Sequence, residues 1–212
     1  MPQAALDGLF IVLGYLAGSL PMGVIVARLT GARDPRTVGS GRTGGTNALR
    51  AMGARRAFAV AGLDVLKGFV PVAVASLVGA SSLGVALVAM ACVLGAWRSV
   101  FLRFHGGRGV ATGIGAALFI QPLAVVLAAP VFFGSILITR WVSLGSLLGT
   151  AAGALFIGMF VILGWNDWPD FLFGVVGAAI VWVAHHDNIG RLMRGEERKF
   201  DPFARGDYQG DR

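Results

Sequence analysis

Two glycine-rich stretches of the chain carry arginines that could hold an anion. Within Val38–Arg50, four glycines, three hydroxyl side chains and two arginines fall in thirteen residues. Glycines let main-chain N–H groups converge on phosphate oxygens, and arginine adds a two-pronged donor. The Gly-Lys-Ser/Thr ending of a Walker A loop is absent, which excludes that kind of nucleotide site. A flexible polar loop is the alternative, although such loops seldom place Asn and Thr so densely.

The second stretch runs from Phe101 to Thr112 and contains Gly106-Gly107-Arg108-Gly109 directly before an apolar run. This position would suit a phosphate, because the N-terminus of a helix adds its dipole to the arginine charge. The alternative is a tight turn whose arginines only set the membrane topology.

Opposite charges interrupt the apolar run 57–79, where Asp64 and Lys67 lie three residues apart. This spacing puts both on one face of a helix, where they can pair. A charge inside a membrane span is costly unless it is paired, which favours a functional role. An ion pair that only locks the helix near the interface is the alternative.

Two further segments are more polar or more glycine-rich than their surroundings. Gly18–Gly23 interrupts the first apolar run, either to let helices approach closely or to break the helix beside a cavity. His185–Leu192 follows the last apolar run, and by itself it could be a membrane-surface anchor.

The composition indicates which elements must position these residues. Of 212 residues, 56% are hydrophobic and only 14% are charged, and a soluble domain of this size cannot bury so much apolar surface. We therefore expect an all-α, polytopic membrane protein. The net charge of +7 does not indicate nucleic-acid binding, because the basic residues flank apolar spans. The single cysteine, Cys92, excludes an internal disulfide.

Apolar runs of about 20 residues can cross a hydrocarbon core about 30 Å thick. The interval 110–139 is long for one helix and short for two, and Gln121-Pro122 in its middle favours a break. We expect two helices there, the first of them (about 110–120) short or tilted. The other predicted spans are 8–29, 57–79, 82–101, 142–163 and 169–186.

The distribution of charge favours seven spans. With a break at Gln121-Pro122, all basic segments share one side, and the other side keeps Asp7, Asp167 and Asp170 without Lys or Arg. The positive-inside rule then predicts an external N-terminus and a cytoplasmic C-terminus. Residues 1–200 would form a single transmembrane domain and residues 201–212 a frayed polar cytoplasmic tail.

In this topology all the segments described above meet at the cytoplasmic face. They would form one cationic, glycine-rich site beside lipid, which suits a phosphorylated substrate together with an acyl chain.

The order of these motifs resembles the bacterial acyl-phosphate:glycerol-3-phosphate acyltransferases, the PlsY family, over almost the whole chain. Any one motif is weak, but five in the same order on the same predicted side are specific. The five matching segments are Gly18–Gly23; Val38–Gly41 together with Gly44, Thr46, Asn47 and Arg50; Asp64–Gly68 with Pro71; Gly106–Thr112; and His185 with Asn188-Ile189, Arg191-Leu192, Gly195 and Glu197.

The resemblance implies a seven-helix enzyme of the cell membrane with its active site facing the cytoplasm. It would transfer a fatty acyl group from acyl phosphate to the sn-1 hydroxyl of glycerol 3-phosphate, giving lysophosphatidic acid and phosphate for phospholipid biosynthesis. No cofactor, coenzyme A or metal is implied. The expected partners are the two substrates and membrane lipid, and not nucleic acid, with the chain acting as a monomer.

The resemblance also implies roles for residues of this chain. Arg50 and Lys67 would neutralise the acceptor's phosphate, while Arg108 and the nearby glycine amides would hold the acyl phosphate. No Ser-His-Asp arrangement is evident, so no acyl-enzyme is expected, and a phosphate oxygen would accept the proton. The expected catalytic residues are Ser40, Lys67, Arg108, His185 and Asn188, and the expected substrate-binding residues are Gly39, Gly41, Thr46, Asn47, Arg50, Gly106, Gly107, Gly109 and Thr112.

Five positions depart from the usual family pattern. The family usually has Asn at Arg42, Ala at Gly45, His at Ala96, Pro at Ser99 and Lys at Arg108. A relative with a changed acceptor or lost activity is therefore one alternative. An anion transporter and a lipid-binding scaffold without chemistry are two others. The transporter is disfavoured because the polar residues gather at one face and no inverted repeat is visible.

Overall fold

The computed structural model describes residues 1–200, and within that range every regular element is a helix. The predicted all-α class is therefore confirmed for the described part of the chain. The predicted polar tail, 201–212, lies outside the described residues. The α-helices are α1 Gln3–Ser19, α2 Met22–Leu29, α3 Gly45–Met52, α4 Ala54–Leu77, α5 Ser82–Trp97, α6 Val110–Ile120, α7 Pro122–Thr139, α8 Val142–Ile162, α9 Trp168–Ala184 and α10 His186–Met193, and the 3-10 helices are η1 Pro35–Thr37 and η2 Val100–Leu102.

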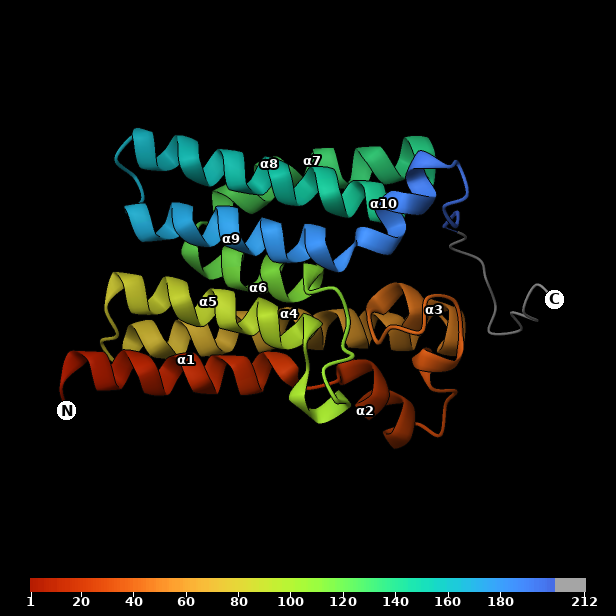
Figure 1. The fold of residues 1–212 in the computed structure, drawn as a ribbon, viewed down its shortest axis with the longest axis horizontal. Coiled ribbons are helices and arrows are strands. Elements are labelled where there is room, and N and C mark those ends of the chain that lie inside the picture. The colour runs from red at the N-terminus through yellow and green to blue at the C-terminus, as the bar shows by residue number, and fades with distance from the viewer. Residues whose placement is uncertain (201–212) are drawn as a thin grey trace.

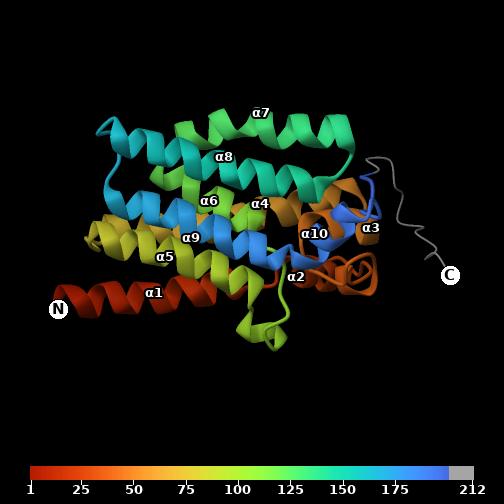
Figure 2. The ribbon, with the colours of Figure 1, turned by 45° about the horizontal axis from the view of Figure 1, so that its top comes forward.

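The long helices lie side by side along one direction (Figure 1). The start of α1 and the α4–α5 and α8–α9 connections lie at one end of this bundle (Figures 1 and 2). At the opposite end lie α2, α3, the segment 98–109 and α10, which we call the polar end. The fold thus brings together four of the five sequence segments that carry the glycine-rich and charged motifs; the fifth, with Asp64 and Lys67, lies within α4.

Several of the helices are long and apolar enough to cross a membrane. By length and hydropathy, α4, α7, α8 and Ser82–Leu102 each qualify alone. The bent pairs α1–α2 (49°) and α9–α10 (65°) raise the total to six if each pair is one span. The helix α6 is apolar but shorter. These helices make the chain a multi-pass membrane protein.

The predicted break in 110–139 is confirmed, because α6 ends at Ile120 and α7 begins at Pro122. The side-chain oxygen of Gln121 accepts a hydrogen bond from the amide of Leu123 at 3.3 Å, which caps α7. The side-chain nitrogen of Asn166, on the α8–α9 connection, lies 3.4 Å from the main-chain oxygen of Ile120. Polar side chains thus satisfy the backbone groups that the break leaves without helical partners.

Glycines set two close helix crossings. A Cβ atom at Gly18 of α1 would overlap the carbonyl of Cys92 on α5, and one at Gly68 of α4 would overlap the carbonyl of Thr112 on α6. Small residues let membrane helices approach until their backbones touch. These crossings hold the end of α1 against α5 and the start of α6 against the interior of α4, next to the motifs that contain Gly18 and Lys67.

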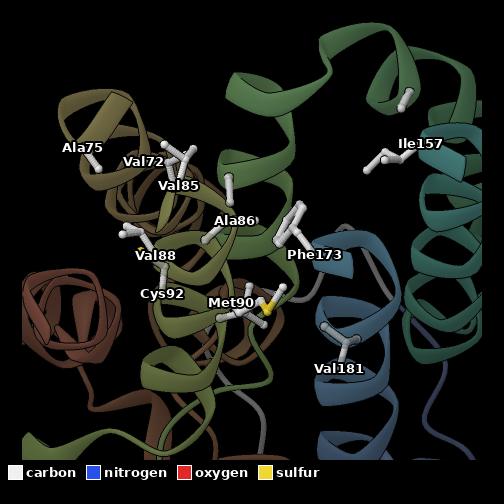
Figure 3. Close-up of a cluster of buried hydrophobic side chains, with 14 of the residues drawn as sticks. Val72, Ala75, Val85, Ala86, Val88, Met90, Cys92, Ile157, Phe173 and Val181 are labelled. Atoms are coloured by element: carbon white, nitrogen blue, oxygen red, sulfur yellow. The ribbon is translucent and has the colours of Figure 1, made fainter. Parts of the chain in front are cut away.

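Helix α5 lies at the centre of the main apolar core, and most of its residues are buried. Figure 3 shows Val85, Val88 and Cys92 of α5 packed beside Val72 of α4, with Phe173 of α9 nearby. The outer faces of α7 and α8 expose large apolar side chains instead. This arrangement is typical of a bundle whose surface is covered by lipid.

Two short helices were not predicted from the sequence. Helix α3 lies inside the glycine-rich stretch and buries Ala48, Leu49 and Met52 against Val26 and Val60. Helix α10 directly follows α9 after the sharp bend at His185. Both are only eight residues long, which is too short for their apolar pattern to stand out in the sequence.

Candidate active site

Asn47 organises the first glycine-rich loop. Its side chain is buried in the first turn of α3. The amide nitrogen lies 3.1 Å from the main-chain oxygen of Val38, 2.9 Å from that of Arg42 and 3.1 Å from Oγ of Ser40. The amide oxygen accepts a hydrogen bond from Nη1 of Arg50 at 3.0 Å. One amide group therefore folds the loop and also orients an arginine.

Gly39 and Gly41 provide the backbone conformations that this loop needs. Both have positive φ angles, 56° and 68°, which residues other than glycine rarely adopt. A Cβ atom at Gly39 would also lie 2.7 Å from Oδ1 of Asn47 and 3.0 Å from Nη1 of Arg50. Gly39 thus leaves room for the Asn47–Arg50 hydrogen bond, while Thr46 lies half-buried beside Asn47 on the same turn of α3.

The second glycine-rich loop is tied to the end of α5. The amide of Gly106 donates to the main-chain oxygen of Trp97 at 3.0 Å, and the amide of Gly107 donates to that of Ala96 at 2.8 Å. These two amides were expected to hold a phosphate, but they already have acceptors. Their contribution is instead to fix the loop in front of Gly109, which has a φ angle of 79° and caps α6.

Arg108 is the cation that this loop presents. Its Nε atom is buried and has no hydrogen-bond partner within residues 1–200. Burial, and next the positive charge of Arg42, lower the pKa of Arg108 to about 10. The guanidinium is therefore charged at neutral pH but poorly compensated. A half-buried, incompletely paired cation favours binding of an anion.

His185 and Asn188 lie at the bend between α9 and α10, with His185 near Arg108. Both are 2% exposed. Nδ1 of His185 lies 2.8 Å from the main-chain oxygen of Val181, and a carbonyl can only accept, so Nδ1 carries the proton in the neutral ring. Nε2 is then an acceptor. The Oδ1 atom of Asn188 is buried and has no partner in the described part of the chain.

Glu197 connects α8 to α10. Its carboxylate accepts hydrogen bonds from Oγ of Ser143 at 3.0 Å, Nδ2 of Asn188 at 2.6 Å and Nε of Arg191 at 2.8 Å. The sequence singled out Glu197 only as part of the family pattern and did not single out Ser143. Three donors on one carboxylate hold Asn188 and Arg191 in place.

Arg42 brings the two glycine-rich loops and α10 together. Its Nη1 atom lies 3.5 Å from the main-chain oxygen of Gly106, and its Nη2 atom lies 4.0 Å from Oδ2 of Asp187. A Cβ atom at Gly107 would lie 3.4 Å from Oγ1 of Thr43. The three segments that the sequence placed on one face are therefore in contact. Arg42 and Arg108 lie close together and form what we call the arginine cluster.

Lys67 lies at the break between α1 and α2. Its Nζ atom forms an ion pair with Oδ1 of Asp64 at 2.7 Å, so the predicted pairing is confirmed. Nζ also donates to the main-chain oxygen of Leu20 at 2.8 Å. Thr112, another expected site residue, is buried where α6 crosses Gly68. Both residues therefore make contacts between helices: Lys67 joins α4 to the α1–α2 break, and Thr112 packs against α4.

An apolar cavity of about 210 Å³ adjoins the arginine cluster between α6, α7, α8 and α9. Val110 and Val181 are two of its lining residues. Val110 follows Gly109 directly, and Val181 accepts the hydrogen bond from His185. From Val181 to Phe173, another lining residue, the cavity follows α9 for about 12 Å. It therefore leads from the polar end into the apolar bundle.

No group of three or more His, Cys, Asp or Glu side chains suited to a metal occurs within residues 1–200. The donor set of the site, which is rich in guanidinium and amide groups, suits an anion instead.

The family model for glycerol-3-phosphate acyltransferase matches residues 8–195, a range that contains every residue predicted for the site. The chain belongs to the glycerol-3-phosphate acyltransferase family. The resemblance found in the sequence is thereby confirmed. Glycerol-3-phosphate acyltransferases from Anaeromyxobacter sp. and Thermus thermophilus are 41% and 43% identical to this chain, over 94% and 92% of it and over 98% and 95% of their own lengths.

The fold is also similar to solved structures of this family. The crystal structure of PlsY, an integral membrane glycerol 3-phosphate acyltransferase, in its glycerol 3-phosphate form has a TM-score of 0.84 and 34% identity, covering 92% of this chain and 96% of that one. The lysophosphatidic acid form has a TM-score of 0.82 and 31% identity, covering 93% and 97%.

Proposed function

We propose that this protein is a membrane acyltransferase that moves a fatty acyl group from acyl phosphate to the sn-1 hydroxyl of glycerol 3-phosphate. The observation that carries the proposal is the position of Arg108. Its half-buried guanidinium, whose Nε atom is buried and has no hydrogen-bond partner within residues 1–200, precedes α6 by two residues, and α6 lines the apolar cavity. An amphiphile with a phosphate head and an acyl tail fits this combination. Relatives named for the acceptor, and a neighbour structure in a glycerol 3-phosphate form, support the choice of acceptor.

The proposed reaction needs little covalent chemistry from the protein. The acceptor oxygen attacks the acyl carbon, the new ester bond forms, and the bond between the acyl carbon and the phosphate oxygen breaks. Phosphate leaves with that electron pair, and the hydroxyl proton passes to a phosphate oxygen. The products are lysophosphatidic acid and phosphate. Catalysis then consists of holding two anions in register and stabilising charge as it develops.

The two substrates divide the site. Arg108 holds the acyl phosphate beside Val110, the first residue of α6 and one of the residues that line the cavity, and Gly109 caps α6 between them. The loop of Gly39, Ser40 and Gly41, with Thr46 next to Asn47, receives the acceptor's phosphate, and Arg50, oriented by Asn47, neutralises it. Gly106, Gly107 and Thr112 shape the walls by close packing.

His185 and Asn188 position the acceptor hydroxyl. Nε2 of the neutral His185 ring and the unpartnered Oδ1 of Asn188 can each accept a hydrogen bond from it, as judged from their partners within residues 1–200. Lys67 acts at longer range by holding the helix break at Leu20, and its charge adds to the positive potential of the site.

For the membrane arrangement we propose seven spans, with α1–α2, α4, α5, α6, α7, α8 and α9 crossing in turn. The start of α1 and the polar end lie at opposite ends of the bundle (Figure 1), as an odd number of spans requires. The arginines of the motifs lie at the polar end, and the positive-inside rule therefore supports an active site that faces the cytoplasm. The chain would act as a monomer surrounded by lipid.

The experiment that tests the proposed function uses purified protein in detergent with palmitoyl phosphate and glycerol 3-phosphate. Phosphate release that depends on the acceptor, together with lysophosphatidic acid detected by mass spectrometry, would support it. Release without the acceptor would indicate a hydrolase, and binding without any release would indicate a scaffold.

A further inference from the structure

Arg42 contacts the segments that meet at the proposed acyl phosphate site, which are the two glycine-rich loops and α10. The family usually has Asn at this position. The residue belongs to the first glycine-rich loop, its Nη1 atom reaches Gly106 in the second, and its Nη2 atom reaches Asp187 on α10. Its side chain is only 23% exposed. The side chain of Arg42 is therefore less exposed than that of a surface arginine, and it also lacks the short hydrogen bonds of an arginine with a structural role.

The contacts of Arg42 are longer than those of an arginine in a well-formed ion pair or hydrogen bond. The distances of 3.5 Å to the Gly106 oxygen and 4.0 Å to the Asp187 carboxylate are at the outer limit for such contacts. Asp187 is itself 52% exposed and lies closer to Nε2 of His186, at 2.8 Å. The carboxylate therefore compensates the charge of Arg42 only weakly.

The neighbourhood as a whole has an excess of positive charge. Arg42, Arg108 and Arg191 face two carboxylates, Asp187 and Glu197. The carboxylate of Glu197 already accepts hydrogen bonds from Ser143, Asn188 and Arg191. Nη2 of Arg191 and Nε of Arg108 are buried and lack hydrogen-bond partners in the described range. An anion would satisfy donors that the folded chain leaves open.

We propose that Arg42 is a second ligand of the acyl phosphate and acts together with Arg108. This inference rests on the proposed function and adds a residue to its donor site. Arg42 exchanges its long contact with Asp187 for a charge-assisted hydrogen bond to a phosphate oxygen. Because negative charge builds on the phosphate as the acyl–oxygen bond breaks, two guanidinium groups stabilise the leaving group better than one.

The test compares Arg42→Asn, Asp187→Asn and the wild type, with Arg55→Asn as a charge-matched control on an exposed arginine of α4. We expect Arg42→Asn to raise the KM for palmitoyl phosphate about tenfold and to leave the KM for glycerol 3-phosphate within about twofold. Asp187→Asn should lower the KM for palmitoyl phosphate, because it frees Arg42. Arg55→Asn should change neither constant.

The same proteins are also melted with and without palmitoyl phosphate, since this shift in melting temperature reports binding without turnover. A smaller shift for Arg42→Asn than for the wild type is expected. Equal shifts and equal KM values for Arg42→Asn and the wild type would overturn the role of Arg42. The role would also be overturned if Asp187→Asn weakened binding of palmitoyl phosphate as much as Arg42→Asn does, because the contact between Arg42 and Asp187 would then serve only to hold the two segments together. A wild type that binds palmitoyl phosphate but never acylates the acceptor would overturn the proposed function instead.

Discussion

The Nζ atom of Lys67 lies 2.8 Å from the main-chain oxygen of Leu20, so a buried cation on α4 closes the break between α1 and α2. The same atom is paired with Asp64 at 2.7 Å. The side chains of Lys67 and Asp64 are only 7% and 12% exposed. An interrupted first helix and a charged pair in the second apolar run of the sequence are thus parts of one structure.

Breaking this pair should destabilise the fold. Lys67→Met leaves the Asp64 carboxylate buried without its cation, which costs about 3–5 kcal/mol and should lower the melting temperature in detergent by about 10 °C. The double variant with Asp64→Asn should recover part of the loss. Lys199→Met, at an exposed position, is the control. If Lys67→Met and the control have the same melting temperature, the ion pair between Lys67 and Asp64 does not stabilise the helix break.

Asn47→Asp tests the loop that receives the acceptor. Aspartate keeps the size of the side chain and can still accept from Arg50, but it loses every donation to the oxygens of Val38, Ser40 and Arg42. We expect the KM for glycerol 3-phosphate to rise at least about tenfold, since a buried network loses its donors. The KM for palmitoyl phosphate should change much less. Equal increases in both constants would contradict the division of the site between two substrates.

Gly153→Leu tests the apolar cavity. Gly153 lines the cavity, and the nearest atom to an added Cβ is 4.0 Å away, so a larger side chain would extend into the open space. The rate with palmitoyl phosphate should fall about tenfold or more relative to that with decanoyl phosphate. Gly62→Leu, where an added Cβ meets nothing within 4 Å, is the matched control. An unchanged chain-length preference would mean that the acyl tail lies elsewhere.

Cysteine labelling tests the orientation in the membrane. The native Cys92 is buried, so an impermeant maleimide should report only introduced cysteines. Ser82 is the first residue of α5, at the α4–α5 connection, and Arg194 directly follows α10; both positions are exposed. Intact cells should label Ser82→Cys, whereas Arg194→Cys should require permeabilisation. The reverse pattern would put the site outside the cytoplasm.

Local rules were sufficient for those parts of the fold that depend on neighbours in the sequence. Pro122 predicted the break between α6 and α7 because proline removes a helical hydrogen bond. The spacing of Asp64 and Lys67 predicted their pairing, and the apolar runs predicted the long helices. The sequence could not reveal that Lys67 reaches Leu20, because that contact depends on how α1 and α4 pack.

The candidate site was predictable as a region but not as a set of contacts. The order of the motifs placed the glycine loops, Arg108 and His185 together. The amides of Gly106 and Gly107 nevertheless donate to Trp97 and Ala96, and only the path of the chain after α5 brings those carbonyls into reach. The network around Glu197 was missed for the same reason, since it joins Ser143 of α8 to α10.

The most direct test of the account is acceptor-dependent phosphate release from palmitoyl phosphate by the wild type, Arg108→Lys and Arg108→Gln. We predict measurable release by the wild type and Arg108→Lys. Arg108→Gln should lose at least about 100-fold in kcat/KM for palmitoyl phosphate, because it removes the charge beside the cavity. Release by Arg108→Gln at the wild-type rate would contradict the central claim that the guanidinium of Arg108 holds the acyl phosphate.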